Sequence, residues 1–480
     1  MSYRTCLHKV LGAAVSTDPE ILRAYDHDLG EMPALLLSLF RRVPDAVVLP
    51  RTVKDVCETM RIALLHHVPV TPRGQGTSGY GGSMPTRGGI LMDISRMNRV
   101  LTIDEQNGFV DVEPGVVWEN LAQALAPFGL DNRICPTSGL SSTVGGLFCM
   151  GGMGIGSLRY GDIKEVVTEI DVVELGGSVR TLTGADMDMY HQSAGCLGIV
   201  TRLRLLCRPR TKLHHVAIQF SNASRIGTAM LEARRLEAYS ASVFSQEYMN
   251  MQAEAAGNAS GGKQGFTMLL SFEEPVWNED AVQAMAKTLG GSLMPQSMAE
   301  HEWEQRFYPM RIKRNGPALL TGEFLIKCTE FQRAWESISR QLSKDRFGLE
   351  AFACHNGTMS VLIYILDSAE DLASLMRMGK AMLPLHAVEK FGGVVYSSGL
   401  WFSSRLDSVL GATKAQRLRE YKQCRDPHGQ MNPGKLCGNS GVTRACILLS
   451  RLIWVGTALS GPISRLLPCR ARRLRLHKEV

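Results

Sequence analysis

The sequence lacks several features that would assign it to common protein classes. Its 12 cysteines include no Cys-x-x-Cys pair and no zinc-like cluster, which argues against an iron–sulfur or structural zinc domain. There is neither the Gly-Lys-Ser/Thr of a P-loop nor a Gly-x-Gly-x-x-Gly fingerprint that opens a helix. The first ten residues have no apolar core after a basic start, so we expect no signal peptide, reduced thiols and a cytoplasmic protein.

An excess of positive over negative charge is found only at the C-terminal end of the chain. Net charge is +7, and residues 438–480 contain seven arginines and one lysine against one glutamate, so the rest of the chain is close to neutral. We therefore expect no nucleic-acid partner. The longest apolar stretch, 445–459, is interrupted by Arg451 and is shorter than the roughly 20 residues of a membrane span. It predicts a linker or a helix that docks another protein; a surface-lying amphipathic segment is the alternative.

Glycine, by contrast, is abundant, with 47 residues, and much of it falls between Gly74 and Gly161. Before this region, predicted strands over 46–50 and 68–72 flank an amphipathic helix over 52–66. This β-α-β unit leads directly into a glycine-rich loop. A helix is predicted over 117–128, and further short strands are predicted over 90–93, 100–103, 109–112, 166–175, 179–182 and 198–205.

The pattern of predicted secondary structure changes after residue 212. Strand patterns alternate with helix patterns, which indicates an α+β domain with an antiparallel sheet covered by helices. The predicted strands are 216–220, 268–272 and 361–366, and the predicted helices are 226–239, 280–289 and 331–342. A charged helix over 413–424 then leads to Asn432-Pro433-Gly434-Lys435.

The first glycine-rich loop has the residues of an anion cradle. Glycines at 74, 76 and 79 admit positive φ and let successive backbone N–H groups point at one anion. Two hydroxyls and an arginine add donors and charge. The loop residues are Arg73, Gly74, Gln75, Gly76, Thr77 and Ser78. A phosphate or pyrophosphate site is one interpretation, and a tight structural turn is the other.

A second loop system combines small residues with hydroxyls. So many small residues leave room for a large flat ligand beside the backbone, and the hydroxyls can bond a ring edge or phosphates. A glycine-dense segment without a ligand would be costly in chain entropy. Its residues are Pro136, Thr137, Ser138, Gly139, Ser142, Thr143, Gly145 and Gly146, followed by Tyr160 and Gly161.

The order of these motifs resembles a known family. Pro-Arg-Gly-x-Gly-Thr, Ser-Thr-Val-Gly-Gly, Tyr-Gly and Gly-Cys-Leu-Gly-Ile-Val-Thr follow one another as in the FAD-binding domain of the vanillyl-alcohol oxidase/p-cresol methylhydroxylase (PCMH-type) superfamily. The glycolate oxidase D-subunit and D-lactate dehydrogenase branch is the most similar. The resemblance covers 44–210 and returns at 426–435. It implies a two-lobed PCMH-type domain, an α+β substrate (cap) domain and a C-terminal return segment.

Five segments of the chain are expected on this basis. They are an N-terminal helical segment over 1–43, the FAD-binding domain over 44–212, the cap over 213–389, the return to the flavin over 390–437, and a basic apolar tail over 438–480. In the family the two loops hold the pyrophosphate and the isoalloxazine. The backbone at Gly198, Ile199 and Val200 meets the adenine side, and Asn432 approaches the flavin.

The resemblance also predicts how FAD is held. Members with covalent flavin use a histidine or cysteine at defined positions, and the first loop has no histidine. Cys135 and Cys149 flank the second loop, but the branch resembled does not use such a linkage. We therefore expect dissociable FAD.

The substrate side departs from the family pattern. The branch carries a His-x-Gly-Asp-Gly-Asn-x-His motif and a later Glu-His-Gly that bind a divalent metal. Here these become His355-Asn356-Gly357-Thr358-Met359 and Ser397-Ser398-Gly399-Leu400-Trp401, so no metal is expected. Trp303-x-x-Arg306 matches the family's carboxylate-binding arginine. Arg306 and His355 are thus the candidate catalytic side chains, against the simpler interpretations of a surface arginine and a structural histidine.

Two functions follow from these patterns. The first is an FAD-dependent dehydrogenase that oxidises a small carboxylate such as a 2-hydroxyacid by hydride transfer to flavin N5. The second is an FAD-carrying electron-transfer or docking subunit of an iron–sulfur complex that has lost the metal-dependent substrate site. A reductive or sugar-lactone reaction stays open. An iron–sulfur or membrane-associated acceptor is expected to dock at the tail, at the inner face of the membrane.

Overall fold

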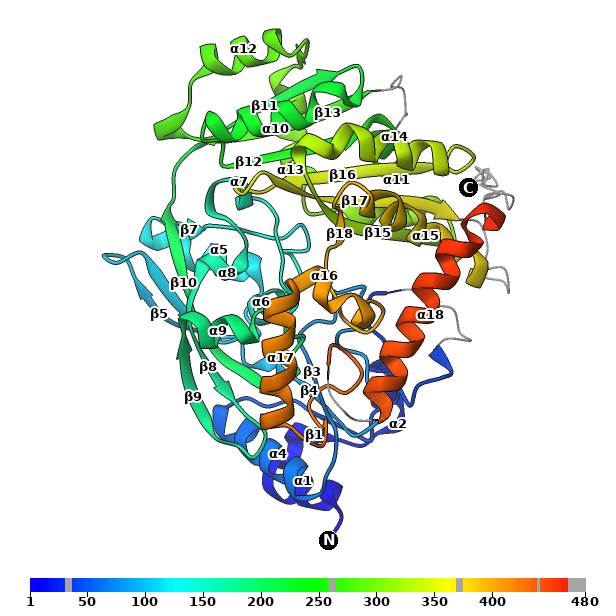
Figure 1. The fold of residues 1–480 in the computed structure, drawn as a ribbon. Helices are drawn as coiled ribbons and strands as arrows, with labels where there is room; N and C mark the ends of the chain where they lie inside the picture. Colours follow the sequence, from blue (N-terminus) through cyan, green and yellow to red (C-terminus); the bar gives the residue numbers. More distant parts are fainter. Residues whose placement is uncertain (31–36, 259–264, 368–373, 438–440, 465–480) are drawn as a thin grey trace, which may run out of the picture. The chain divides into compact units, whose positions relative to one another are not determined.

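The computed structural model describes residues 1–30, 37–258, 265–367, 374–437 and 441–464 (Figure 1). The chain divides into two compact units. The first comprises Met1–Lys212 and Val395–Ile453, and the second comprises Leu213–Val394 and the chain from Trp454 onward. Part of the N-terminal helical segment expected over 1–43 and the arginine-rich end after Ser464 lie outside the described residues.

The first unit begins with a small, largely parallel sheet in the order β1-β2-β4-β3. Its strands are β1 (Val15–Ser16), β2 (Ala46–Val48), β3 (Val70–Arg73) and β4 (Ile90–Asp93). Helix α4 (Val53–Leu65) connects β2 to β3 and starts at a capping box, in which Thr52 Oγ1 accepts from the backbone N–H of Asp55 at 3.2 Å. Its buried face carries Val56, Met60 and Ala63. This β-α-β segment leads from the end of β3 directly into the first glycine-rich loop.

A second, antiparallel sheet in this unit has the order β5-β6-β10-β8-β9, with β7 also paired to β10. The strands are β5 (Val100–Asp104), β6 (Phe109–Val112), β7 (Leu130–Asn132), β8 (Val167–Val173), β9 (Val179–Thr183) and β10 (Ile199–Pro209). One face of β10 buries Leu203 and Leu205 in the core. On its other face Arg202 bonds Asp111 and Asp171, as a half-solvated strand requires.

The C-terminal return segment is held against β3. Helix α17 (Ala412–Arg425) precedes it, and the buried Lys422 Nζ donates to Asp426 Oδ2 at 2.6 Å and to the Met431 carbonyl at 2.7 Å. The backbone of Val70 donates to the Gln430 carbonyl at 2.8 Å, and that of Asn432 donates to the Val70 carbonyl at 2.7 Å. The return segment therefore extends the parallel pairing of the first sheet.

The second unit is built on one sheet, in the order β14-β11-β13-β12-β16-β17-β15-β18. The strands are β11 (Leu213–Phe220), β12 (Ser240–Ser245), β13 (Phe266–Glu273), β14 (Ser292–Leu293), β15 (Ala318–Lys327), β16 (Phe347–Ala353), β17 (Thr358–Asp367) and β18 (Val394–Val395). Gly322 on β15 lies against Ala381 of α15 (Ser374–Glu389). Gly348 on β16 lies against Tyr248 of α11 (Gln246–Ala255). Helices thus cover both faces, and the α+β fold class is confirmed.

Candidate functional site

The first glycine-rich loop follows β3 and is fixed by the residues around Asp28. Arg73 Nη1 donates to the His27 carbonyl at 2.5 Å, and its guanidinium lies 5.4 Å from the centre of the Tyr25 ring. The backbone N–H of Leu29 reaches the Gly76 carbonyl at 3.0 Å. Gly76 has φ of +67°, and a Cβ there would collide with the Arg73 side chain, so glycine is required twice over. Arg73 therefore braces the loop.

The second loop turns at Pro136–Gly139, where the backbone N–H of Gly139 donates to the Pro136 carbonyl at 2.9 Å. Thr143 then caps α6 (Val144–Met150), its Oγ1 accepting from the backbone N–H of Gly146 at 3.2 Å. A Cβ on Gly145 would lie 2.5 Å from Pro114 Cβ. This glycine is therefore imposed by packing, while the half-buried hydroxyls of Thr137 and Ser138 in the turn can meet a ligand.

The fold brings the two loops into contact. A Cβ on Gly74 would lie only 2.5 Å from Thr143 Oγ1. The two loops can therefore pack this closely only because Gly74 has no side chain. Beside this contact Ser142 Oγ is buried and has no hydrogen-bond partner among the described residues. An unpaired buried hydroxyl is costly without a ligand, so the junction is suited to a polar molecule.

Asn432 ties three separate segments together. Its Nδ2 donates to the Gly82 carbonyl at 2.8 Å and to the Ala194 carbonyl at 2.6 Å, while its backbone pairs with Val70. Its φ is +41°, a conformation that asparagine tolerates better than most residues. Its Oδ1 is buried and, in the part of the chain that the structure describes, has no partner. That oxygen can accept a bond from a ligand.

The remaining predicted residues contribute backbone or packing. Ile199 and Val200 are buried in the core, so only their backbone can meet a ligand. A Cβ on Gly198 would lie 2.7 Å from the Val173 carbonyl oxygen. Gly161 has φ of +81°, and the Tyr160 ring lies 5.3 Å from the Arg133 guanidinium.

Sequence reasoning missed the segment 396–400, which is hydrogen-bonded to a residue that follows the first loop and to residues at and just after the end of helix α6. The backbone N–H of Leu400 donates to the Tyr80 carbonyl at 2.8 Å, and Ser397 Oγ donates to the Met150 carbonyl at 3.1 Å. The Tyr396 hydroxyl accepts from the backbone N–H of Met153 at 2.8 Å. The stretch where the family pattern places Glu-His-Gly thus supports the loops, and no local motif in it signals this role.

His191 was also missed by sequence reasoning. Burial lowers its pKa to about 3, with the nearby Lys414 ammonium acting in the same direction, so the ring is neutral at physiological pH. Its Nε2 is buried and unpaired within the described residues. The ring lies 5.7 Å from that of Phe148 on α6. It is a further polar group beside the second loop.

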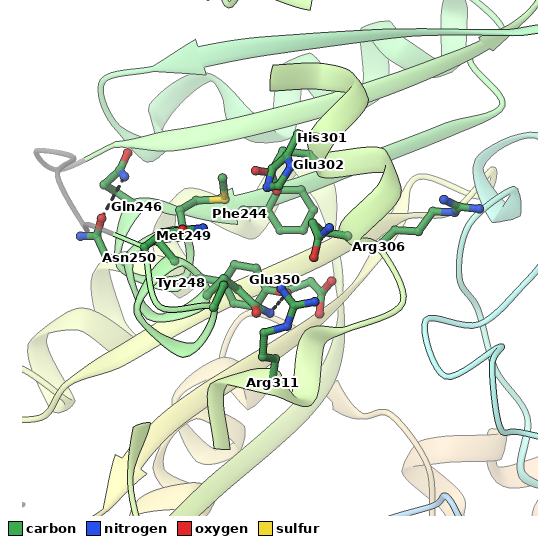
Figure 2. Close-up of a pocket in the computed structure, with 15 residues that line it drawn as sticks. Phe244, Gln246, Tyr248, Met249, Asn250, His301, Glu302, Arg306, Arg311 and Glu350 are labelled. Carbon is green, nitrogen blue, oxygen red and sulfur yellow. Dashed lines mark hydrogen bonds between the residues drawn. The ribbon is translucent and has the colours of Figure 1, made fainter. Parts of the chain in front are cut away.

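The second unit contains a cavity of about 460 Å³ between α11, α13 (Gln296–Gln305) and the sheet. Figure 2 shows Glu302 at one side and Glu350 on the sheet floor, with Arg311 reaching toward them. Burial raises the pKa of both glutamates to about 7, although the Tyr364 hydroxyl donates to Glu350 at 2.8 Å and opposes the shift. Both carboxyls can therefore donate or accept near neutral pH.

Arg306 lies at the end of α13 and lines the edge of the cavity, and its side chain points away from Glu302 and Glu350 (Figure 2). Its guanidinium is 4.2 Å from the centre of the Trp303 ring and 4.3 Å from that of Phe307, and its Nη1 donates to the Trp303 carbonyl at 2.5 Å. Stacking between aromatic rings fixes the planar fork that carboxylates prefer. Arg306 is therefore held by its neighbours and is not a freely moving surface arginine.

His355 lies in the tight turn of the β16–β17 hairpin, where its Nδ1 is 3.4 Å from Cys354 Sγ. On β15, Glu323 accepts from Ser360 Oγ of β17 at 3.0 Å, so it is bonded across the sheet. Among the described residues no group of three or more His, Cys, Asp or Glu side chains is placed to hold a metal ion.

Comparisons with known proteins match both units. The family described as FAD binding domain matches residues 44–183, and the family described as FAD linked oxidases, C-terminal domain, matches residues 215–436. Glycolate oxidase subunit GlcD of Bacillus subtilis is 34% identical over 184 residues, which is 36% of this chain and 39% of that protein. This chain thus spans about two fifths of that relative's length in the match.

Two further similarities extend over more of the chain. Mitochondrial D-lactate dehydrogenase (cytochrome) of Arabidopsis thaliana is 26% identical over 427 residues, which is 82% of this chain and 73% of that protein. The crystal structure of p-cresol methylhydroxylase with substrate bound has a TM-score of 0.74 at 17% identity, covering 90% of this chain and 96% of that one. The last similarity concerns the fold.

Proposed function

Since this chain belongs to the FAD-linked oxidoreductases of the vanillyl-alcohol oxidase/p-cresol methylhydroxylase superfamily and its cofactor is FAD, we propose that it is a dehydrogenase for a small carboxylate such as a 2-hydroxyacid. The similar proteins are named for glycolate and for D-lactate, which are both 2-hydroxyacids. That shared chemistry supports the substrate class.

The observation that carries the proposal is the junction of the two loops in the first unit. Gly74 faces Thr143 without a side chain, and Ser142 Oγ and Asn432 Oδ1 are unpaired among the described residues. These groups fit the phosphates and ring edge of a flavin dinucleotide. We assign FAD to Arg73–Ser78, Pro136–Gly146 and Asn432, held without a covalent bond. FAD supplies hydride acceptance when it is bound.

On the substrate side, the proposal gives Arg306 the role of holding the carboxylate. The rings of Trp303 and Phe307 hold its guanidinium in one orientation and partly desolvate it, which strengthens a bidentate bond to a carboxylate. His355 is assigned a secondary, positioning role near the turn of its hairpin. The reducing equivalents would pass to a separate iron–sulfur or membrane-associated acceptor.

A second candidate function is favoured by one observation. Where the resemblance predicts metal ligands, the chain has the His355 turn and Ser397–Trp401, and the latter supports the loops through backbone and hydroxyl bonds. A protein with this replacement could carry FAD as an electron-transfer or docking subunit of an iron–sulfur complex, without oxidising a substrate of its own.

Anaerobic mixing of the purified holoprotein with glycolate and with D-lactate separates the two functions. A dehydrogenase bleaches the flavin absorbance and turns over with an artificial acceptor. Arg306→Met should lower kcat/KM roughly ten- to a hundredfold, because a charged hydrogen bond contributes about 1.5–3 kcal/mol. The exposed Arg340→Met is the matched control. Flavin that neither acid reduces, but that a chemical reductant bleaches normally, would support the carrier function instead.

A further inference from the structure

Helix α18 (Gly441–Ser464) exposes three of its large apolar side chains on its outer face. Leu448, Leu452 and Val455 are 57%, 60% and 49% exposed, and their i, i+4, i+7 spacing places them on one face. Arg444 and Arg451 are exposed on the same face and make no ion pair within the described residues. We call this set of five residues the outer stripe.

The opposite face of the helix carries its polar residues and is buried. Thr443 Oγ1 accepts from the backbone N–H of Gly434 at 3.1 Å, and Ser450 Oγ donates to the Trp401 carbonyl at 2.7 Å. Cys446 packs against Gly434, where a Cβ would lie 2.8 Å from its Sγ. This is the reverse of a soluble helix, which turns its apolar face inward. The hydroxyls of the inner face are hydrogen-bonded to the protein, whereas the apolar side chains of the outer stripe remain exposed to solvent.

The positive charge around the outer stripe indicates what kind of surface binds it. No aspartate or glutamate occurs between Asp426 and Glu479, and the sequence after Ser464 adds five arginines and one lysine interleaved with leucines. An apolar stripe with cations beside it is complementary to anionic headgroups over acyl chains. The three apolar side chains are also few for a stable protein interface, which needs about 800 Å² from each partner.

By length and composition alone, α18 is the helix of the described chain that could cross a membrane, over Gly441–Ala458 with a mean hydropathy of 1.2. A span would expose all sides to lipid, whereas Thr443 and Ser450 are bonded to the first unit, and Arg451 lies at mid-length. We propose that α18 lies in the plane of an anionic lipid surface, with the outer stripe in contact with it. This inference does not rest on the proposed substrate.

Vesicle co-sedimentation of the full-length holoprotein tests this proposal. We expect binding to vesicles of phosphatidylcholine with phosphatidylglycerol, weak binding to phosphatidylcholine alone, and weaker binding as salt is raised. Leu448→Gln with Leu452→Gln should reduce partitioning roughly ten- to a hundredfold through lost apolar burial. Arg444→Gln and Arg451→Gln should each reduce it about fivefold, and only on the anionic vesicles.

Leu65→Gln is the matched control, since Leu65 is 75% exposed at the end of α4 and far from the stripe in sequence. Flavin absorbance and circular dichroism show that each variant has folded. Equal binding of the leucine pair variant and the control would overturn the proposal. So would a protein that ignores both vesicles but sediments as a dimer that the pair variant dissociates, because the stripe would then join two copies of the chain.

Discussion

Gly74 and Thr143 meet where two distant loops converge: a Cβ on Gly74 would lie 2.5 Å from Thr143 Oγ1. The same oxygen caps α6 by accepting from the backbone N–H of Gly146. One residue without a side chain therefore permits both the approach of the loops and the start of the helix beside the candidate flavin site.

Replacing this glycine should weaken FAD binding. Gly74→Ala forces Thr143 to move and disturbs its cap, an overpacking that costs about 1–3 kcal/mol. We expect the affinity of the apoprotein for FAD to fall about tenfold or more, measured by flavin fluorescence during titration. Gly456→Ala, with open space around its Cβ, is the control. Equal affinities for both variants would contradict the assignment of this junction to FAD.

The amide of Asn432 should matter more than its backbone conformation. Asn432→Ala removes both Nδ2 bonds and leaves the Gly82 and Ala194 carbonyls buried without them, at about 1–3 kcal/mol each. Asn432→Gly loses the same bonds but relieves the positive φ, so its melting temperature should fall less. Thermal unfolding by circular dichroism checks the order wild type, glycine, alanine. A melting temperature of the alanine variant equal to that of the wild type would show that the two Nδ2 hydrogen bonds do not stabilise the fold.

The flavin should leave the protein on acid precipitation. A thioether link to Cys149 would need its thiolate, and burial raises the pKa of that thiol to about 12. We expect the yellow colour in the supernatant for wild type, Cys135→Ser and Cys149→Ser alike, followed by absorbance. Colour that stays in the wild-type pellet would contradict dissociable FAD. The cysteine variant that then releases the colour would identify the cysteine that is linked to the flavin.

Glu350 should make the protein less stable as pH rises. Burial raises its pKa from 4.5 to about 7, so the folded protein holds a proton that the unfolded chain releases between these values. The free energy of unfolding should therefore fall across this window, by about 3 kcal/mol for a fully buried group. Glu350→Gln should reduce the pH dependence of the melting temperature, and the part that remains comes from Glu302, whose pKa burial also raises to about 7. The exposed Glu304→Gln should keep the wild-type slope, and two identical slopes would contradict the prediction.

The sequence by itself determined much of the local structure. The predicted strands over 166–175 and 179–182 are β8 and β9, and the predicted helix over 413–424 is α17, because strand patterns and helical periodicity are local signals. The ordered glycine motifs also gave the superfamily and FAD, both of which the comparisons confirm. Several motifs in one order are far more specific than one loop.

Only the tertiary structure decided which distant residues meet. The pairing of Asn432 with Val70, the support of the loops by Ser397 and the contact of Gly74 with Thr143 join segments whose spacing along the chain carries no signal. The burial of Glu350 and the outward stripe of α18 are likewise set by neighbours. Sequence patterns record periodicity and backbone freedom, whereas burial, pKa shifts and long-range hydrogen bonds arise only when the chain has folded.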